Sequence, residues 1–254
     1  PDEHHLGTGV ILMGFAERYR GLRPGLAMGT DANNLDFWGI VYGRPTAFLL
    51  LLLVGDIRWL TPNILTHMSN LFLVAGSLAI LLDSMPAFIA AAIMLNISLT
   101  FDCADGQMAR YRKNGSTLGS YYDKASDYFG MMLMYCTMSW VVFQRTEHAW
   151  YFLLAICALG CNMMTGYTKW LVVAHGHKPQ PASASMPVKG LKLVGRVALK
   201  IFEFREPDIF LWFAIALLID RPELALILMG ISQPIAGIAA TIYRGWLMSR
   251  PPAN

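Results

Sequence analysis

Long apolar segments recur along this chain, and they restrict its fold more than any other feature. A helix needs roughly 20 mostly apolar residues to cross a bilayer. The segments that meet this requirement are residues 64–82, 86–108, 117–143, 149–173 and 222–247. The 254-residue chain is also 55% hydrophobic and only 15% charged, which is too apolar for an ordinary soluble domain. The sequence therefore predicts an all-α, polytopic membrane protein.

A sixth span is predicted around the apolar run at residues 209–219, which is too short to cross a bilayer alone. The helix reaches sufficient length if it begins near Phe204 and carries Arg205, Glu206 and Asp208 in its first turns. The proline at position 207 suits such a start, because the first turn of a helix needs no backbone donor there. Six spans place both chain ends on the same side of the membrane.

The distribution of basic residues indicates which side that is. Of the 20 Lys and Arg residues, only Arg145 and Arg221 fall in the connections assigned to the outside. Cytoplasmic loops carry the excess of Lys and Arg, so we expect both termini to face the cytoplasm, in a bacterial inner membrane. The net charge of +3 then reflects membrane topology and does not indicate a nucleic-acid partner.

The chain before the first span divides into two parts. Residues 36–60 combine Trp, Tyr and Arg with a short leucine run, which predicts an amphipathic helix lying in the membrane interface. The tripeptide 61–63 (Thr-Pro-Asn) should break the path and let the first span begin near Asn63. We expect residues 1–35 to form an N-terminal cytoplasmic extension and residues 36–254 to form one six-helix membrane domain.

Four aspartates provide the chemistry. Asp102 and Asp105 are three apart on the second span, while Asp123 and Asp127 are four apart on the third, so each pair lies on one helical face. Each charge near hydrocarbon costs on the order of 2.5 to 3.5 kcal/mol. Hard divalent cations with oxygen ligands offset this cost best, so two facing pairs predict a site for Mg²⁺ or Mn²⁺, with two ions expected.

Small residues and one arginine accompany the acids. Gly106, Ala109 and Gly119 leave room for a bulky ligand to approach the backbone. Arg110 is a fixed cation whose guanidinium can bind a phosphate through two hydrogen bonds. A metal site, small residues that leave room for a ligand, and the guanidinium of Arg110 together predict a pyrophosphate site.

The segment from Asp102 to Asp127 resembles the signature of the CDP-alcohol phosphotransferase (CDP-alcohol phosphatidyltransferase) family. That signature reads D-x-x-D-G-x-x-A-R, eight residues, then G-x-x-x-D-x-x-x-D, and this sequence matches every specified position. The six-span layout and the Thr-Pro-Asn tripeptide extend the resemblance over most of residues 36–248.

The resemblance implies a role for each acid. Asp102, Asp105 and Asp123 would bind the metal ions, and Asp127 would act as a ligand or as the general base that deprotonates an acceptor alcohol, with CMP as the leaving group. It also implies a homodimer. The residues that it places around the cytidine diphosphate are Asn63, Thr66, Asp105, Gly106, Ala109, Arg110 and Gly119.

Three cations resemble the acceptor-phosphate clamp found in some members of this family: Lys169, Arg205 and Arg244. Such a clamp would favour a phosphorylated alcohol, for example inositol phosphate or glycerol phosphate. Alternatively, Lys169 and Arg244 extend to the membrane interface, and Arg205 pairs with an acid in its own helical turn.

The leading functional hypothesis is transfer of a phosphatidyl group from CDP-diacylglycerol to a polar alcohol, in phospholipid biosynthesis. An alternative within the same family is transfer from a soluble CDP-alcohol, such as CDP-inositol or CDP-choline. A transporter of ions or solutes is the alternative from another class, because intramembrane carboxylates also mark ion pathways. The clustering of all four acids at one membrane edge beside Arg110 argues against it.

Overall fold

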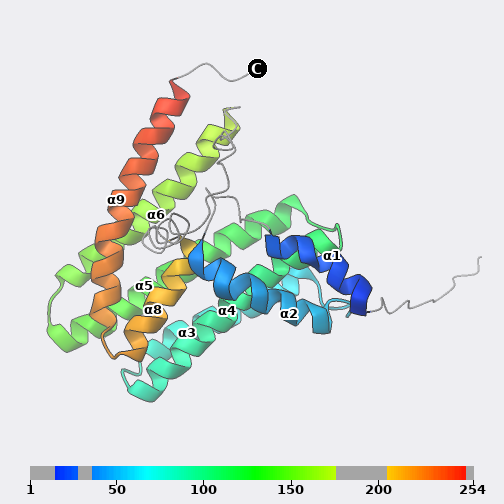
Figure 1. Ribbon diagram of the computed structural model, residues 1–254. Helices are drawn as coiled ribbons and strands as arrows, with labels where there is room; N and C mark the ends of the chain where they lie inside the picture. Colours follow the sequence, from blue (N-terminus) through cyan, green and yellow to red (C-terminus); the bar gives the residue numbers. More distant parts are fainter. Residues whose placement is uncertain (1–14, 28–35, 176–204, 250–254) are drawn as a thin grey trace, which may run out of the picture.

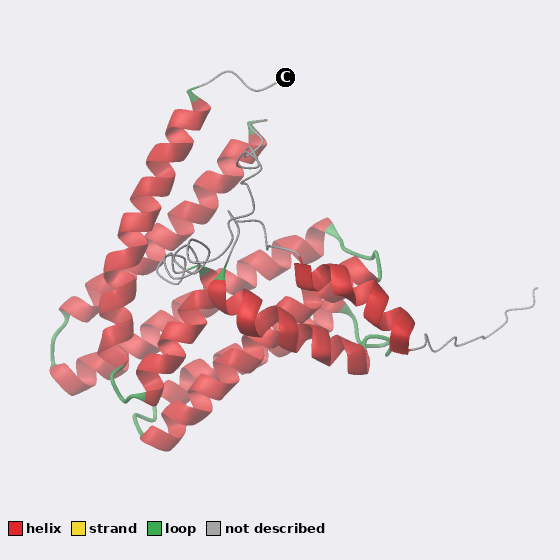
Figure 2. Ribbon diagram, in the orientation of Figure 1, coloured by secondary structure: helices red, strands yellow, loops and turns green. Residues whose placement is uncertain are grey.

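A computed structural model describes residues 15–27, 36–175 and 205–249, and all regular structure in these ranges is helical (Figure 2). The prediction of an all-α fold is confirmed for this part of the chain. In order, the elements are α1 (Phe15–Ala27), the π-helix η1 (Gly39–Gly43), α2 (Arg44–Val54), α3 (Pro62–Ile80), α4 (Met85–Tyr111), α5 (Thr117–Thr146), α6 (Trp150–Ala174), α8 (Glu206–Leu218) and α9 (Pro222–Met248).

Four of these helices, α3, α4, α6 and α9, are long and apolar enough to cross a membrane. By length and composition, these four helices indicate an integral membrane protein. Helix α5 has 30 residues but is less apolar, because its first turns carry the second acidic pair. Helix α8 has 13 residues, and residues 176–204 before it lie outside the described ranges. The count of six spans therefore stays a prediction.

The starts of three helices follow from their capping residues. The Thr61 hydroxyl accepts a hydrogen bond from the Ile64 backbone N–H at 3.3 Å, and Pro62 opens α3. The Ser116 hydroxyl accepts from the Gly119 N–H at 2.9 Å and starts α5 in the same way. Helix α8 begins at Glu206, with Arg205 as its N-cap and Pro207 in its first turn, two residues after the predicted start near Phe204, which lies outside the described ranges.

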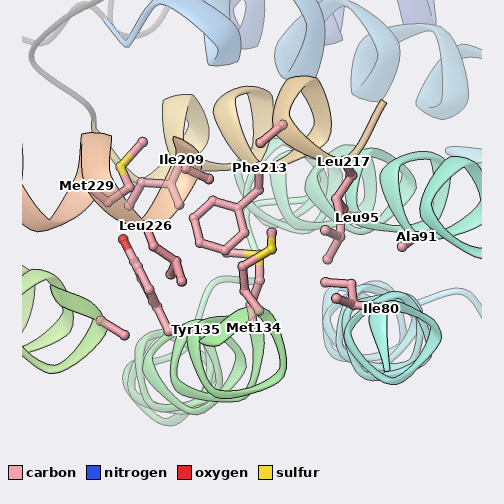
Figure 3. Close-up of a cluster of buried hydrophobic side chains, with 14 of the residues drawn as sticks. Ile80, Ala91, Leu95, Met134, Tyr135, Ile209, Phe213, Leu217, Leu226 and Met229 are labelled. Carbon is pink, nitrogen blue, oxygen red and sulfur yellow. The ribbon is translucent and has the colours of Figure 1, made fainter. Parts of the chain in front are cut away.

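The helices pack in an up-and-down bundle (Figure 1). Helix α4 lies between α3 and α8, and α5 packs against α3 and α6. Helices α6 and α9 form a pair that extends beyond the others (Figure 1). In the main core, Tyr135 of α5 and Phe213 of α8 meet edge to face with their ring centroids 5.1 Å apart (Figure 3).

A smaller core joins α1 and α2 to α3 and α4. Leu22 of α1 is buried in it, and the Arg18 guanidinium donates to the Leu52 carbonyl and to the Asp56 carboxylate. Helix α1 therefore packs on α2. The prediction of a cytoplasmic extension also covers residues 1–14 and 28–35, which lie outside the described ranges.

The segment predicted as an interfacial helix is anchored at its start. The Trp38 backbone N–H donates to Asp208 Oδ1 at 2.7 Å, and its indole Nε1 donates to Asn96 Oδ1 at 2.8 Å. Asp36 pairs with Arg44 at 2.5 Å. These contacts join η1 and α2 to α4 and α8.

Three short connections meet at the end of the bundle opposite the acidic motif. They link α3 to α4, α5 to α6 and α8 to α9. Arg145, at the end of α5, pairs with Asp83 at 2.6 Å and with Asp220 at 2.8 Å. One guanidinium thus links two of the three connections to the end of α5.

Candidate active site

The acidic motif is brought together by the facing ends of α4 and α5. Asp102 on α4 and Asp123 and Asp127 on α5 each offer a carboxylate oxygen, and these oxygens all lie within 4.8 Å of one another. All three side chains are half-buried. Carboxylate oxygens at this spacing can converge on one hard divalent cation, so the residues present fit the predicted metal.

The fourth acid, Asp105, lies outside this group of three but is held in a fixed orientation. Its Oδ2 accepts a hydrogen bond of 2.5 Å from the Thr66 hydroxyl of α3, and both side chains are only 6% exposed. A buried carboxylate that accepts a hydroxyl donor is restricted in rotation. Its role as a metal ligand remains a prediction.

The small residues of the motif lie beside the predicted polar partners. A Cβ added to Gly119 would be 3.4 Å from Asn63 Oδ1, so the starts of α3 and α5 are adjacent. A Cβ on Gly106 would lie 3.2 Å from Arg110 Nη1, so the guanidinium lies over the glycine backbone. Ala109 is half-buried nearby on α4. The nucleotide-binding roles of these residues stay predictions.

Two residues that were not predicted from the sequence also belong to the site. The Lys124 ammonium lies 2.6 Å from Asp127 Oδ2 and 3.6 Å from Asp123 Oδ2. It also lies 3.9 Å from Glu206 Oε2, at the first residue of α8. The spacing of Lys124 and Asp127, three apart on one helix, could have indicated the first contact. The approach of α8 has no local sequence signal.

The three predicted acceptor-binding cations lie on α6, α8 and α9. Arg205 caps α8, directly before Glu206. Arg244 of α9 donates to the Thr165 carbonyl and, at 2.7 Å, to the Thr168 hydroxyl of α6. Lys169, the residue after Thr168, is exposed. The contacts of Arg244 support a role in joining α6 to α9, and the clamp remains a prediction.

Helix α6 also approaches the acidic end of α5 closely. A Cβ added to Gly166 would lie 1.8 Å from the hydroxyl oxygen of Tyr128, the residue after Asp127. Only glycine fits at position 166 while the tyrosine keeps this position. The approach places the second half of α6 next to the site.

Comparison with known proteins identifies the family. The family model for CDP-alcohol phosphatidyltransferase matches residues 59–232, which is more than half of the chain. This chain belongs to the CDP-alcohol phosphatidyltransferase family. It is therefore a phosphotransferase enzyme, and the resemblance seen in the acidic motif is confirmed. The matched range holds the whole motif, Lys169 and Arg205, and it ends before Arg244.

Two solved structures share the fold of this family member. Both are phosphatidylinositol phosphate synthase from Mycobacterium tuberculosis. The crystal structure with CDP-DAG bound has a TM-score of 0.56 at 20% identity, with 82% of this chain and 94% of that chain covered. The structure in complex with manganese and citrate has a TM-score of 0.54 at 19% identity, covering 82% and 89%. A search of curated protein sequences finds no match.

Proposed function

We propose that this enzyme transfers a phosphatidyl group from CDP-diacylglycerol to a small polar alcohol and releases CMP, as a step of phospholipid biosynthesis. The observation that carries this proposal is the convergence of Asp102, Asp123 and Asp127 within a complete family motif. A CDP-diacylglycerol donor is supported by the structurally similar phosphatidylinositol phosphate synthase, which is known with CDP-DAG bound. The same synthase is also known with manganese, which supports Mn²⁺ or Mg²⁺ here.

The aspartates have two tasks. Asp102, Asp123 and Asp127 would hold the divalent cations, with Asp105, oriented by Thr66, as a further ligand. When bound, the cations supply Lewis-acid stabilisation of the pyrophosphate charge. Asp127 takes the proton from the acceptor hydroxyl. The acceptor oxygen then forms a bond to the phosphorus that carries the diacylglycerol group, and the bond from this phosphorus to the oxygen of CMP breaks.

The nucleotide is proposed to lie along the adjoining ends of α3, α4 and α5. Asn63, next to Gly119, can form hydrogen bonds with the cytosine base, and Arg110, over Gly106, can bind the diphosphate. The small side chain of Ala109 leaves room for the nucleotide next to α4. This placement leaves the diacylglycerol on the membrane side, where a donor can enter sideways from the inner leaflet.

The acceptor is proposed to be a phosphorylated alcohol, such as inositol phosphate or glycerol phosphate. Arg205 supports this proposal best, because the adjacent Glu206 approaches Lys124 in the acidic cluster. Lys169 would complete the phosphate contact together with Arg244. The proposal further places the active site on the cytoplasmic side and two copies of the chain in a homodimer.

A screen of acceptors tests this function. Purified protein is incubated with CDP-diacylglycerol and Mg²⁺ or Mn²⁺, and CMP release is compared for inositol phosphate, glycerol phosphate, serine, inositol and choline. We expect release with a phosphorylated alcohol and its loss in Asp127→Ala. A parallel assay replaces CDP-diacylglycerol by CDP-inositol or CDP-choline, and CMP release with only these donors would instead support the soluble-donor alternative. Turnover that persists in folded Asp127→Ala would contradict the assignment of the base.

A further inference from the structure

Lys124 places a positive charge among the carboxylates of the candidate metal site. Its ammonium contacts Asp127 at 2.6 Å, the shortest of its three carboxylate contacts. The motif specifies the acids before and after this position but leaves position 124 itself open. The side chain of Lys124 is 44% exposed, while that of Asp127 is 20% exposed. The lysine side chain is thus the more exposed of the two, and its flexible four-carbon stem lets the ammonium leave the carboxylate without any backbone movement.

A divalent cation and this ammonium need the same carboxylate. A cation held by Asp102, Asp123 and Asp127 would lie within a few ångströms of an ammonium that stays on Asp127 Oδ2. Positive charges at such a distance repel each other strongly in a half-buried site. The repulsion is relieved if the ammonium moves away along its flexible four-carbon stem.

Glu206 is placed to receive the ammonium. Its Oε2 is already 3.9 Å from Lys124 Nζ, and the glutamate side chain is 43% exposed. Glu206 is the first residue of α8, where the positive end of the helix dipole stabilises a carboxylate. A modest rotation of the lysine stem would exchange Asp127 for this second partner.

We propose that Lys124 tunes the metal affinity of the site by competing with the divalent cation for Asp127, and that Glu206 receives its ammonium when the cation binds. This inference rests on the proposed function, because it requires the acidic cluster to bind a divalent cation. Lys124 and Glu206 are then positioning residues. Lys124 competes with the cation for Asp127, and Glu206 accepts the displaced ammonium.

Binding of Mn²⁺ to the full-length protein in detergent tests the exchange. Electron paramagnetic resonance measures the concentration of free Mn²⁺ directly, so the measured affinity does not depend on enzyme activity. Lys124→Met, which keeps most of the stem and removes the charge, should bind Mn²⁺ about fivefold more tightly. Lys124→Gln should shift the affinity in the same direction. Arg58→Met removes an exposed charge next to the start of α3 and should leave the affinity unchanged.

The role of Glu206 is tested by a double-mutant cycle. Glu206→Gln alone should weaken Mn²⁺ binding about threefold, because the ammonium loses its alternative partner. In the Lys124→Met background the same change should have no effect. A simple loss of nearby negative charge would weaken binding equally in both backgrounds and would overturn this part of the proposal.

The remaining outcomes separate this inference from the proposed function. Unchanged or weaker Mn²⁺ binding in both folded Lys124 variants would overturn the competition. A pair that only holds α5 to α8 would lower the melting temperature without changing the affinity, which also overturns it. Absence of Mn²⁺ binding in the wild type, or wild-type affinity in Asp102→Asn, would instead contradict the metal site on which the proposed function depends.

Discussion

The hydrogen bond between Thr66 and Asp105 provides the sharpest test of how α3 supports the site. Thr66→Val replaces the hydroxyl by a methyl group of nearly the same volume, so the packing is retained while the 2.5 Å donor is lost. Both side chains are 6% exposed, and a hydrogen bond to a charged group contributes about 1.5 to 3 kcal/mol. If Asp105 binds the metal as proposed, its carboxylate can rotate away from the ion once this donor is lost.

The expected result is a loss of Mn²⁺ affinity of about 10- to 100-fold, the range seen when a residue that orients a metal ligand is removed. CMP release at saturating donor should then need a correspondingly higher Mn²⁺ concentration. Thr66→Ser keeps the hydroxyl and should retain most of the affinity.

Ser69→Ala is the matched control for Thr66→Val. Ser69 lies one turn further along α3, is 5% exposed, and donates to the Ser98 carbonyl at 3.0 Å. Its loss should lower stability and leave Mn²⁺ affinity unchanged. If Thr66→Val binds Mn²⁺ as tightly as the wild type, Asp105 does not depend on Thr66 for its orientation, and the argument from this contact is refuted.

Three further predictions concern contacts around the site and at the other end of the bundle. Gly166→Ala should destabilise the protein, because its Cβ would lie 1.8 Å from the hydroxyl of Tyr128, and Tyr128→Phe should restore much of the loss in thermal unfolding. Arg145→Met should lower stability by about 1 kcal/mol and leave CMP release at low temperature unchanged; an unaltered melting temperature would contradict the role of this ion-pair network. Arg244→Gln should lower stability if the arginine joins α6 to α9, whereas a large rise in the acceptor KM with normal stability would support the clamp.

The parts of the fold that follow from local sequence agree with the predictions. The starts of α3 and α8 were predictable because Pro62 follows Thr61 directly and Pro207 lies two residues after Arg205, and capping depends on residues a few positions apart. The two acidic pairs were predictable for the same reason, since spacings of three and four place them on one helical face. Their convergence into one cluster was predicted from the motif and is confirmed for three of the four acids.

Contacts between helices distant in the sequence were not predictable in the same way. The approach of Glu206 to Lys124 depends on how α8 packs against its neighbours, and no local pattern reports that. Thr66 was predicted as a nucleotide contact, but its position against Asp105 needs the packing of α3 on α4. The π-helix η1 also has no clear signal, because its five residues form an ordinary apolar stretch with two glycines.

In the proposed mechanism, the facing ends of α4 and α5 hold a divalent cation. Anomalous scattering from a crystal grown with Mn²⁺ and CDP-diacylglycerol tests it most directly. We predict a manganese peak bound by Asp102, Asp123 and Asp127, on the pyrophosphate side of the nucleotide. A well-ordered nucleotide with no manganese between these carboxylates, or with manganese bound elsewhere, would contradict the account.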